Sequence, residues 1–258
     1  MFFVYFLLLL THFFFTVWFY ITTTTNSSLN YGYNLLITTF VILQIYQGFK
    51  YLKIYPELKK IIIPIQIGNA LFAIALYIWY YYNITGQEIP YPGLPDLFFM
   101  LYYPATIYSL IQISKHAKSI WNFGSIVTVI LFSITLAGAS SFFLLNQAVD
   151  LSQSTLLISL NIIYPILDAL LAAISIAILR SQTSLNQHYF FLFIFGFVFL
   201  GFADVLFAYQ TNHETYWNGS VVDLFYGICH MSISLGFYFL PKILNLETQP
   251  KQVVSQNI

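Results

Sequence analysis

Eight apolar stretches, separated by short polar segments, make up most of this 258-residue chain. Each is long enough to cross about 30 Å of hydrocarbon as a helix that rises about 1.5 Å per residue. We therefore expect an all-α, polytopic transmembrane helix bundle of about eight spans. The stretches cover residues 2–20, 34–50, 61–82, 96–114, 123–145, 155–179, 189–209 and 222–241.

The composition independently excludes a soluble globule, because 59% of the residues are hydrophobic, 20% are aromatic and only 7% are charged. The connections between stretches are too short to bury a separate core. We expect one transmembrane domain over residues 1–245 and a short polar cytoplasmic tail over residues 246–258. The few cations flank the spans, where anionic lipid headgroups are the expected partner, and nothing in the sequence points to nucleic acid.

The basic residues fall on one side of the predicted membrane. All nine follow an even-numbered stretch, and the loops after odd-numbered stretches contain none. Short loops rich in Lys and Arg stay in the cytoplasm, so we expect a multi-pass cell-membrane protein with both termini cytoplasmic. The first stretch lacks a basic leader and a cleavage site, and we expect it to be retained as an anchor. The basic residues are Lys50, Lys53, Lys59, Lys60, Lys115, Lys118, Arg180, Lys242 and Lys251.

Four acidic residues lie within or at the mouth of apolar stretches, where an ionised carboxylate costs a few kcal/mol unless it is paired, protonated or hydrated. Asp96, Asp204 and Asp223 share one level near the outer side, beside the proline-rich loop 90–95. We expect them to border a polar pocket that opens toward the outer leaflet. The alternative is that Asp96 and Asp223 only cap helix N-termini.

The fourth acid, Asp168, is deeper. It lies about thirteen residues into its stretch, roughly 20 Å by helical rise. It follows Pro165, whose missing N–H frees carbonyls of the preceding turn. We expect Asp168 to face the bundle interior and to form a hydrogen bond there.

Short elements recur beside these acids. The pair Tyr164-Pro165 echoes Tyr103-Pro104, and both prolines are expected to kink their helices. The four acids, the two tyrosines of these pairs and a histidine in the last stretch are the candidate ligand-binding residues: Asp96, Asp168, Asp204, Asp223, His230, Tyr103 and Tyr164.

Taken in order, four segments resemble a known family: Pro90-Tyr-Pro-Gly-Leu-Pro-Asp-Leu-Phe-Phe-Met-Leu-Tyr-Tyr-Pro104, Tyr164-Pro-Ile-Leu-Asp168, Gly201-Phe-Ala-Asp204 and Tyr216-Trp-Asn-Gly-Ser-Val-Val-Asp223. The family is the multi-span N-terminal membrane sensory region of bacterial and archaeal signalling proteins. There it precedes cytoplasmic diguanylate cyclase, phosphodiesterase or histidine kinase domains. The chain departs from the pattern at Tyr226, where Trp is expected.

The resemblance implies a membrane sensory or ligand-binding module. Because only a short polar tail follows Pro241, it implies a stand-alone version without an output domain. Such a module passes its signal to a separate cytoplasmic or membrane partner.

Two histidines raise the question of a cofactor. His12 and His230 each lie near the middle of their stretch, and imidazoles on facing helices can hold a haem iron. No second pair and no cofactor motif accompany them, so we favour hydrogen-bonded core histidines, and we predict no cofactor and no metal site.

An intramembrane, lipid-acting hydrolase is the main competing function. It would use Asp168, Asp204, Asp223 and His230 as acid and base groups. The sequence lacks His-Glu-x-x-His, Gly-x-Ser-x-Gly, Walker and dinucleotide-binding patterns, which makes an enzyme the less favoured interpretation. A small-solute transporter and an assembly subunit also stay open.

Overall fold

The structure, a computed structural model, describes residues 2–22, 28–116, 126–135, 155–180 and 187–246, together with residues 124 and 138. All regular secondary structure in these residues is helical, as the all-α prediction requires. The long helices are α1 (Phe2–Thr22), α2 (Ser28–Ile54), α3 (Lys59–Thr85), α4 (Leu94–His116), α6 (Thr155–Arg180), α7 (Gln187–Asn212) and α8 (Val221–Tyr238). Two short elements, η1 (Pro56–Leu58) and α9 (Leu240–Ile243), accompany them.

Seven of these helices are long and apolar enough to cross a membrane, which confirms the polytopic transmembrane bundle. They correspond to seven of the eight predicted stretches. The remaining stretch, 123–145, lies largely outside the described residues, and its described part includes a shorter apolar helix, Ile126–Thr135. The eighth span therefore stays a prediction.

The last predicted stretch is interrupted near its C-terminal end. Helix α8 ends at Tyr238, and α9 begins at Leu240 with Pro241 in its first turn. Proline lacks the N–H that would continue the ladder, and its ring crowds the carbonyl four residues earlier. Its fixed φ suits the first turn of a new helix, so the chain restarts as α9.

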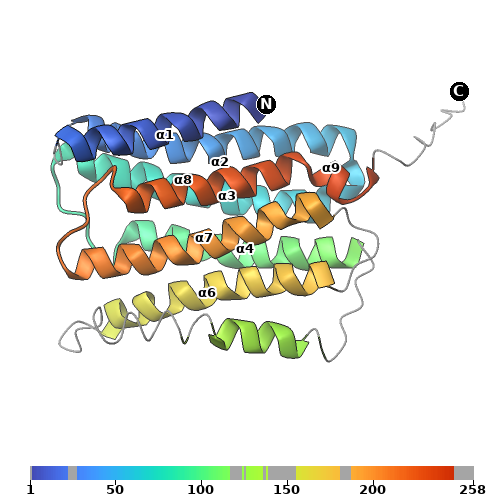
Figure 1. Ribbon diagram of the computed structural model, residues 1–258. Coiled ribbons are helices and arrows are strands. Elements are labelled where there is room, and N and C mark those ends of the chain that lie inside the picture. The colour runs from blue at the N-terminus through green and yellow to red at the C-terminus, as the bar shows by residue number, and fades with distance from the viewer. Residues whose placement is uncertain are drawn as a thin grey trace, which may run out of the picture.

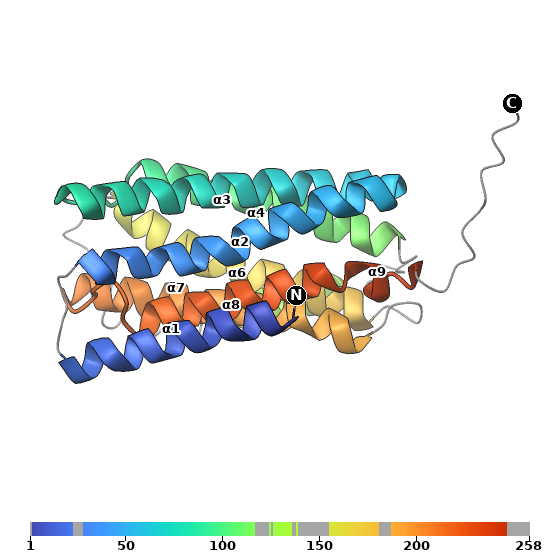
Figure 2. The ribbon, with the colours of Figure 1, turned by 90° about the horizontal axis from the view of Figure 1, so that it is seen from above.

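Six helices form a closed ring (Figures 1 and 2). Around the ring, α2 packs on α3, α3 on α4, α4 on α6, α6 on α7, α7 on α8, and α8 again on α2. Helix α1 lies outside the ring, against α8 and α2. Hydrogen bonds connect α1, α2 and α8: the Ser234 hydroxyl of α8 lies 2.9 Å from the Tyr5 hydroxyl of α1 and donates to the Phe40 carbonyl of α2 at 3.1 Å.

The seven described basic residues gather at one end of the bundle, on the right in Figure 1, where α2, α4, α6 and α8 end. We call it the cation end. The opposite end has no Lys or Arg among the described residues, and we call it the cation-free end. Which end faces the cytoplasm stays a prediction. The residues at the cation end are Lys50, Lys53, Lys59, Lys60, Lys115, Arg180 and Lys242.

Helices α4 and α6 run in the same direction (Figure 1). The end of α4 and the start of α6 therefore lie at opposite ends of the bundle, as the predicted fifth span requires. Helix α1 begins in the half of the bundle nearer the cation end, and the number of crossings stays a prediction.

Candidate functional site

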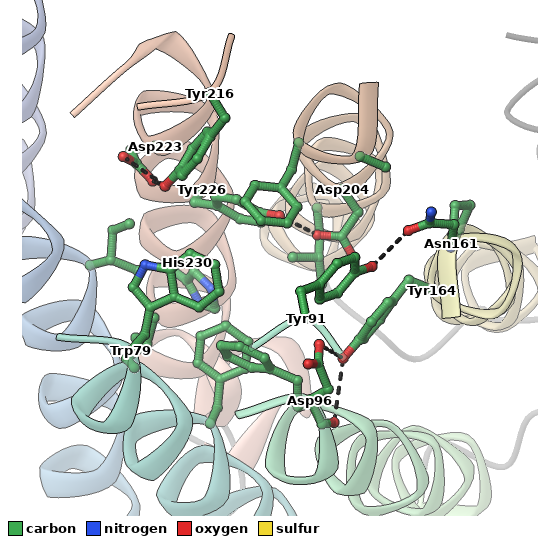
Figure 3. Close-up of a pocket in the computed structure, with 18 of the residues that line it drawn as sticks. Trp79, Tyr91, Asp96, Asn161, Tyr164, Asp204, Tyr216, Asp223, Tyr226 and His230 are labelled. Atoms are coloured by element: carbon green, nitrogen blue, oxygen red, sulfur yellow. Dashed lines mark hydrogen bonds between the residues drawn. The ribbon is translucent and has the colours of Figure 1, made fainter. Parts of the chain in front are cut away.

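A cavity of about 100 Å³ lies inside the helix ring toward the cation-free end (Figure 3). Every helix of the ring contributes to its wall, together with the loops before α4 and α8. We call it the ring cavity. Its polar or titratable lining residues are Trp79, Tyr91, Asp96, Tyr103, Asn161, Tyr164, Asp204, Tyr216, Asp223, Tyr226 and His230.

Asp96 combines a local and a long-range hydrogen bond. One carboxylate oxygen accepts the Gly93 N–H at 2.7 Å, at the start of α4. The other accepts the Tyr164 hydroxyl of α6 at 3.0 Å. The capping alternative is therefore correct for one oxygen of Asp96, while the other oxygen joins two helices at the cavity wall.

Asp223 also accepts a backbone N–H at the start of its helix, but its tyrosine partner, Tyr216, lies in the loop directly before α8. The Asp223 carboxylate accepts the Gly219 N–H at 2.5 Å, and the Tyr216 hydroxyl lies 3.3 and 3.4 Å from its two oxygens. The N-cap of α8 is Ser220, whose hydroxyl accepts the Val222 N–H at 3.3 Å. Asp223 therefore supports the start of α8 from within its first turn, and the capping alternative describes it well.

Asp168 faces the interior, as predicted. Its side chain is only 1% exposed, and one carboxyl oxygen accepts the Tyr103 hydroxyl at 2.8 Å. Gly201 of α7 lies opposite, where a methyl group in place of the glycine hydrogen would come within 3.1 Å of the Asp168 Cβ. The glycine thus lets α7 approach α6 closely at the level of the acid.

Asp204 lies next to Asp168 across a shared tyrosine. The Tyr103 hydroxyl lies 3.4 Å from Asp204 as well as close to Asp168, so it bridges acids from α6 and α7. The Tyr226 hydroxyl of α8 donates to the other Asp204 oxygen at 2.5 Å. Asp204 is only partly buried, and it lines the cavity.

Tyr91 and Asn161 close the cavity on the α6 side. The Tyr91 hydroxyl donates to the Asn161 side-chain oxygen at 2.7 Å. Burial, together with the nearby Asp96 and Asp204 charges, raises the pKa of Tyr91, so its hydroxyl stays a neutral donor. Two buried polar atoms in the lining, Asn161 Nδ2 and His230 Nε2, have no hydrogen-bond partner.

An amide pair anchors the loop before α8 to the end of α3. The side chains of Asn83 and Asn218 donate to each other at 3.2 Å in both directions. The Trp79 indole N–H adds a bond to the Asn218 oxygen at 3.3 Å. This loop carries Tyr216, so the amide pair helps to fix the partner of Asp223.

Six of the seven predicted ligand-binding residues line the ring cavity, and the seventh, Asp168, bonds to Tyr103 in its wall. Pro104 and Pro165 lie inside α4 and α6, and the kinks expected there stay predictions. His230 lines the cavity, with its ring 4.5 Å from the Phe72 ring between centroids.

His12 is fully buried on α1, which packs on α8, and it lies against Gly227 rather than in the cavity lining. Within the described part of the chain, no three His, Cys, Asp or Glu residues are arranged to hold a metal ion. The absence of haem and of any other cofactor stays a prediction from the sequence.

Several lining residues were missing from the sequence-based set, notably Tyr91, Asn161, Tyr216 and Tyr226. Asn161 carried a usable signal, because an amide inside an apolar span needs a partner. The tyrosines carried little signal, because aromatic residues are common throughout this chain, and their role depends on which of them face the ring interior.

No known protein family, curated protein or solved structure matches this chain. The resemblance to membrane sensory regions accordingly stays a hypothesis, and the function has to be proposed from the site itself.

Proposed function

We propose that this chain is an integral membrane sensory module that binds a small ligand in the ring cavity and passes a signal to a separate partner protein. The observation that carries the proposal is the cavity itself, with its wall of aromatic rings and a few convergent polar groups. Concave, mostly apolar sites of this kind are the usual form of a small-molecule site.

The hydrogen bonds of the cavity support a signalling role. The acids of α4 and α7 are bonded to tyrosines of other helices: Asp96 to Tyr164 of α6, and Asp204 to Tyr226 of α8. A ligand that replaces one of these bonds changes the contacts between two helices. Binding is then coupled to helix position, because the ligand favours the arrangement that it fits best.

The partner is expected at the cation end. The ring helices run the full length of the bundle, so a shift at the cavity reaches their far ends. The charge bias assigns that end to the cytoplasm, and the family resemblance implies a separate cytoplasmic or membrane protein as the recipient.

A cysteine-labelling experiment tests the proposal. Ala208, which lines the cavity, is replaced by cysteine in a Cys229→Ala background, and a fluorescent amino acid is placed at Lys53 on the cation end. A membrane-impermeant thiol reagent should modify the cavity cysteine and change the fluorescence at position 53. The matched control is Ala172→Cys, a buried residue of α6 outside the lining, which should not react.

Two results would contradict the proposal. An unreactive cysteine at position 208 would show that no ligand of that size enters the cavity. Modification without any fluorescence change would show that filling the cavity is not communicated to the cation end.

One observation favours a second candidate, the lipid-acting hydrolase. Asp168 and Asp204 lie on adjacent helices and share the Tyr103 hydroxyl, and paired carboxyl groups can act as acid and base. Hydrolysis of a fluorogenic phospholipid by the purified protein, lost in both Asp168→Asn and Asp204→Asn, would replace the sensory proposal with this one.

A further inference from the structure

The ring cavity has acidic groups without matching basic ones. Asp96, Asp204 and Asp223 line it, and no Lys or Arg is present in the described lining. The described basic residues lie at the opposite end of the bundle. Buried carboxylates are stable only when paired, protonated or hydrated, so a positive ligand would supply the partner that the protein does not.

Asp204 is the acid that a ligand can reach. Asp96 and Asp223 are buried, and each already accepts a backbone N–H as well as a tyrosine hydroxyl. Asp204 retains accessible surface in the cavity. The Tyr103 hydroxyl is 3.4 Å from Asp204 Oδ2 and closer to Asp168, and the neighbouring Asp168 carboxyl group is within hydrogen-bonding reach of Asp204.

Two unpartnered polar groups point independently to an occupant. The side chains of Asn161 and His230 are 2% and 4% exposed and line opposite parts of the cavity (Figure 3). Asn161 Nδ2 and His230 Nε2 have no hydrogen-bond partner. Leaving such atoms unpaired costs about 1–3 kcal/mol each, so the site favours a ligand with polar atoms of its own.

The apolar part of the wall suits an organic cation better than a metal ion. The rings of Phe72, Trp79, Phe99 and Phe207 line the cavity between the polar groups. Aromatic faces attract an ammonium group and also cover an attached hydrocarbon. A volume of about 100 Å³ corresponds to roughly seven to ten water-sized units, since one water needs about 10–15 Å³.

We propose that the ring cavity selects a small protonated amine with an apolar body, its ammonium group pairing with Asp204. The ammonium N–H groups also donate to hydroxyl oxygens of the wall tyrosines. Asn161 and His230 form hydrogen bonds with any further polar group of the ligand. This inference rests on the proposed ligand-binding function and specifies the chemical class that the same cavity takes.

A matched pair of probes tests the class. Phenethylamine and 2-phenylethanol have the same size and shape, but only the amine carries a charge at neutral pH. Binding is measured on the purified protein in a neutral detergent by the change in tryptophan fluorescence, since Trp79 lines the cavity. The amine should bind about tenfold more tightly than the alcohol, the scale expected for an ammonium among aromatic faces and a carboxylate.

The variants assign that preference to the cavity. Asp204→Asn should abolish the difference between amine and alcohol, and the conservative Asp204→Glu should restore part of it. The matched control is Glu88→Gln, which removes an exposed acid at the cation-free end and should leave the preference unchanged. Circular dichroism and gel filtration show whether each variant keeps its helical fold.

The outcomes separate the two proposals. Equal binding of amine and alcohol would overturn the inference while supporting a ligand cavity. Failure of both probes to bind would also overturn it, and labelling at position 208 would then decide the cavity's role. A preference that persists in Asp204→Asn would show that the amine binds elsewhere.

Discussion

The Tyr103 hydroxyl holds the two deepest acids of the site, so its removal is the sharpest stability test. In Tyr103→Phe, the buried Asp168 loses its 2.8 Å hydrogen bond to the Tyr103 hydroxyl. A buried group left unsatisfied costs about 1–3 kcal/mol. Bonds between helices inside membrane proteins average about 0.6 and reach about 1.7 kcal/mol. We expect a loss of about 1–2 kcal/mol, near the upper part of the membrane range, because the acceptor is fully buried.

The assay is reversible unfolding in mixed micelles with increasing SDS, followed by far-ultraviolet circular dichroism. Tyr108→Phe is the matched control, since it removes the same hydroxyl from the same helix at a side chain that is 45% exposed. That control should lose no more than about 0.5 kcal/mol.

A double-mutant cycle with Asp168→Ala isolates the bond from other effects of each substitution. Tyr103→Phe and Asp168→Ala should couple by about 0.5–2 kcal/mol, whereas Tyr108→Phe and Asp168→Ala should be additive to within about 0.5 kcal/mol. Additivity of the first pair, or equal losses in the two tyrosine variants, would refute the proposed role of Tyr103.

Three further predictions concern the bundle around the site. Gly201→Leu should destabilise the protein by about 1–3 kcal/mol in the same assay, because even a Cβ there lies 3.1 Å from Asp168; an unchanged midpoint would contradict this. Ser220→Ala should cost about 1 kcal/mol through loss of the α8 cap, and Ser220→Asn should restore most of it. In intact cells, an impermeant reagent should label Gln87→Cys but not Lys53→Cys, and the reverse pattern would invert the predicted orientation.

The course of the seven described membrane helices was largely predictable. Long apolar runs form helices in lipid because the backbone has no other way to satisfy its polar groups. The end of α8 was missed, because hydropathy continues through Phe239 and Leu240 while Pro241 stops the helix ladder. Hydropathy measures how apolar a stretch is, but it does not show where the backbone hydrogen bonds of the helix stop.

For the site, the sequence predicted the levels of the acids but not their partners. Asp96, Asp204 and Asp223 were expected at one depth, and all three line the ring cavity. Neither the bridge from Tyr103 to both Asp168 and Asp204 nor the bond from Tyr226 could be foreseen. These bonds depend on helix order and rotation around the ring, which apolar periodicity leaves undefined in a lipid environment.

Protection of a cavity cysteine by a ligand is the most direct test of amine binding in the ring cavity. The reagent's modification rate at Ala208→Cys, in the Cys229→Ala background, is measured with no addition, with phenethylamine and with 2-phenylethanol. A ligand-binding cavity that selects amines predicts rapid modification, strong slowing by the amine and little slowing by the alcohol. A cysteine that never reacts, or that reacts at one rate under all three conditions, would contradict amine binding in the ring cavity.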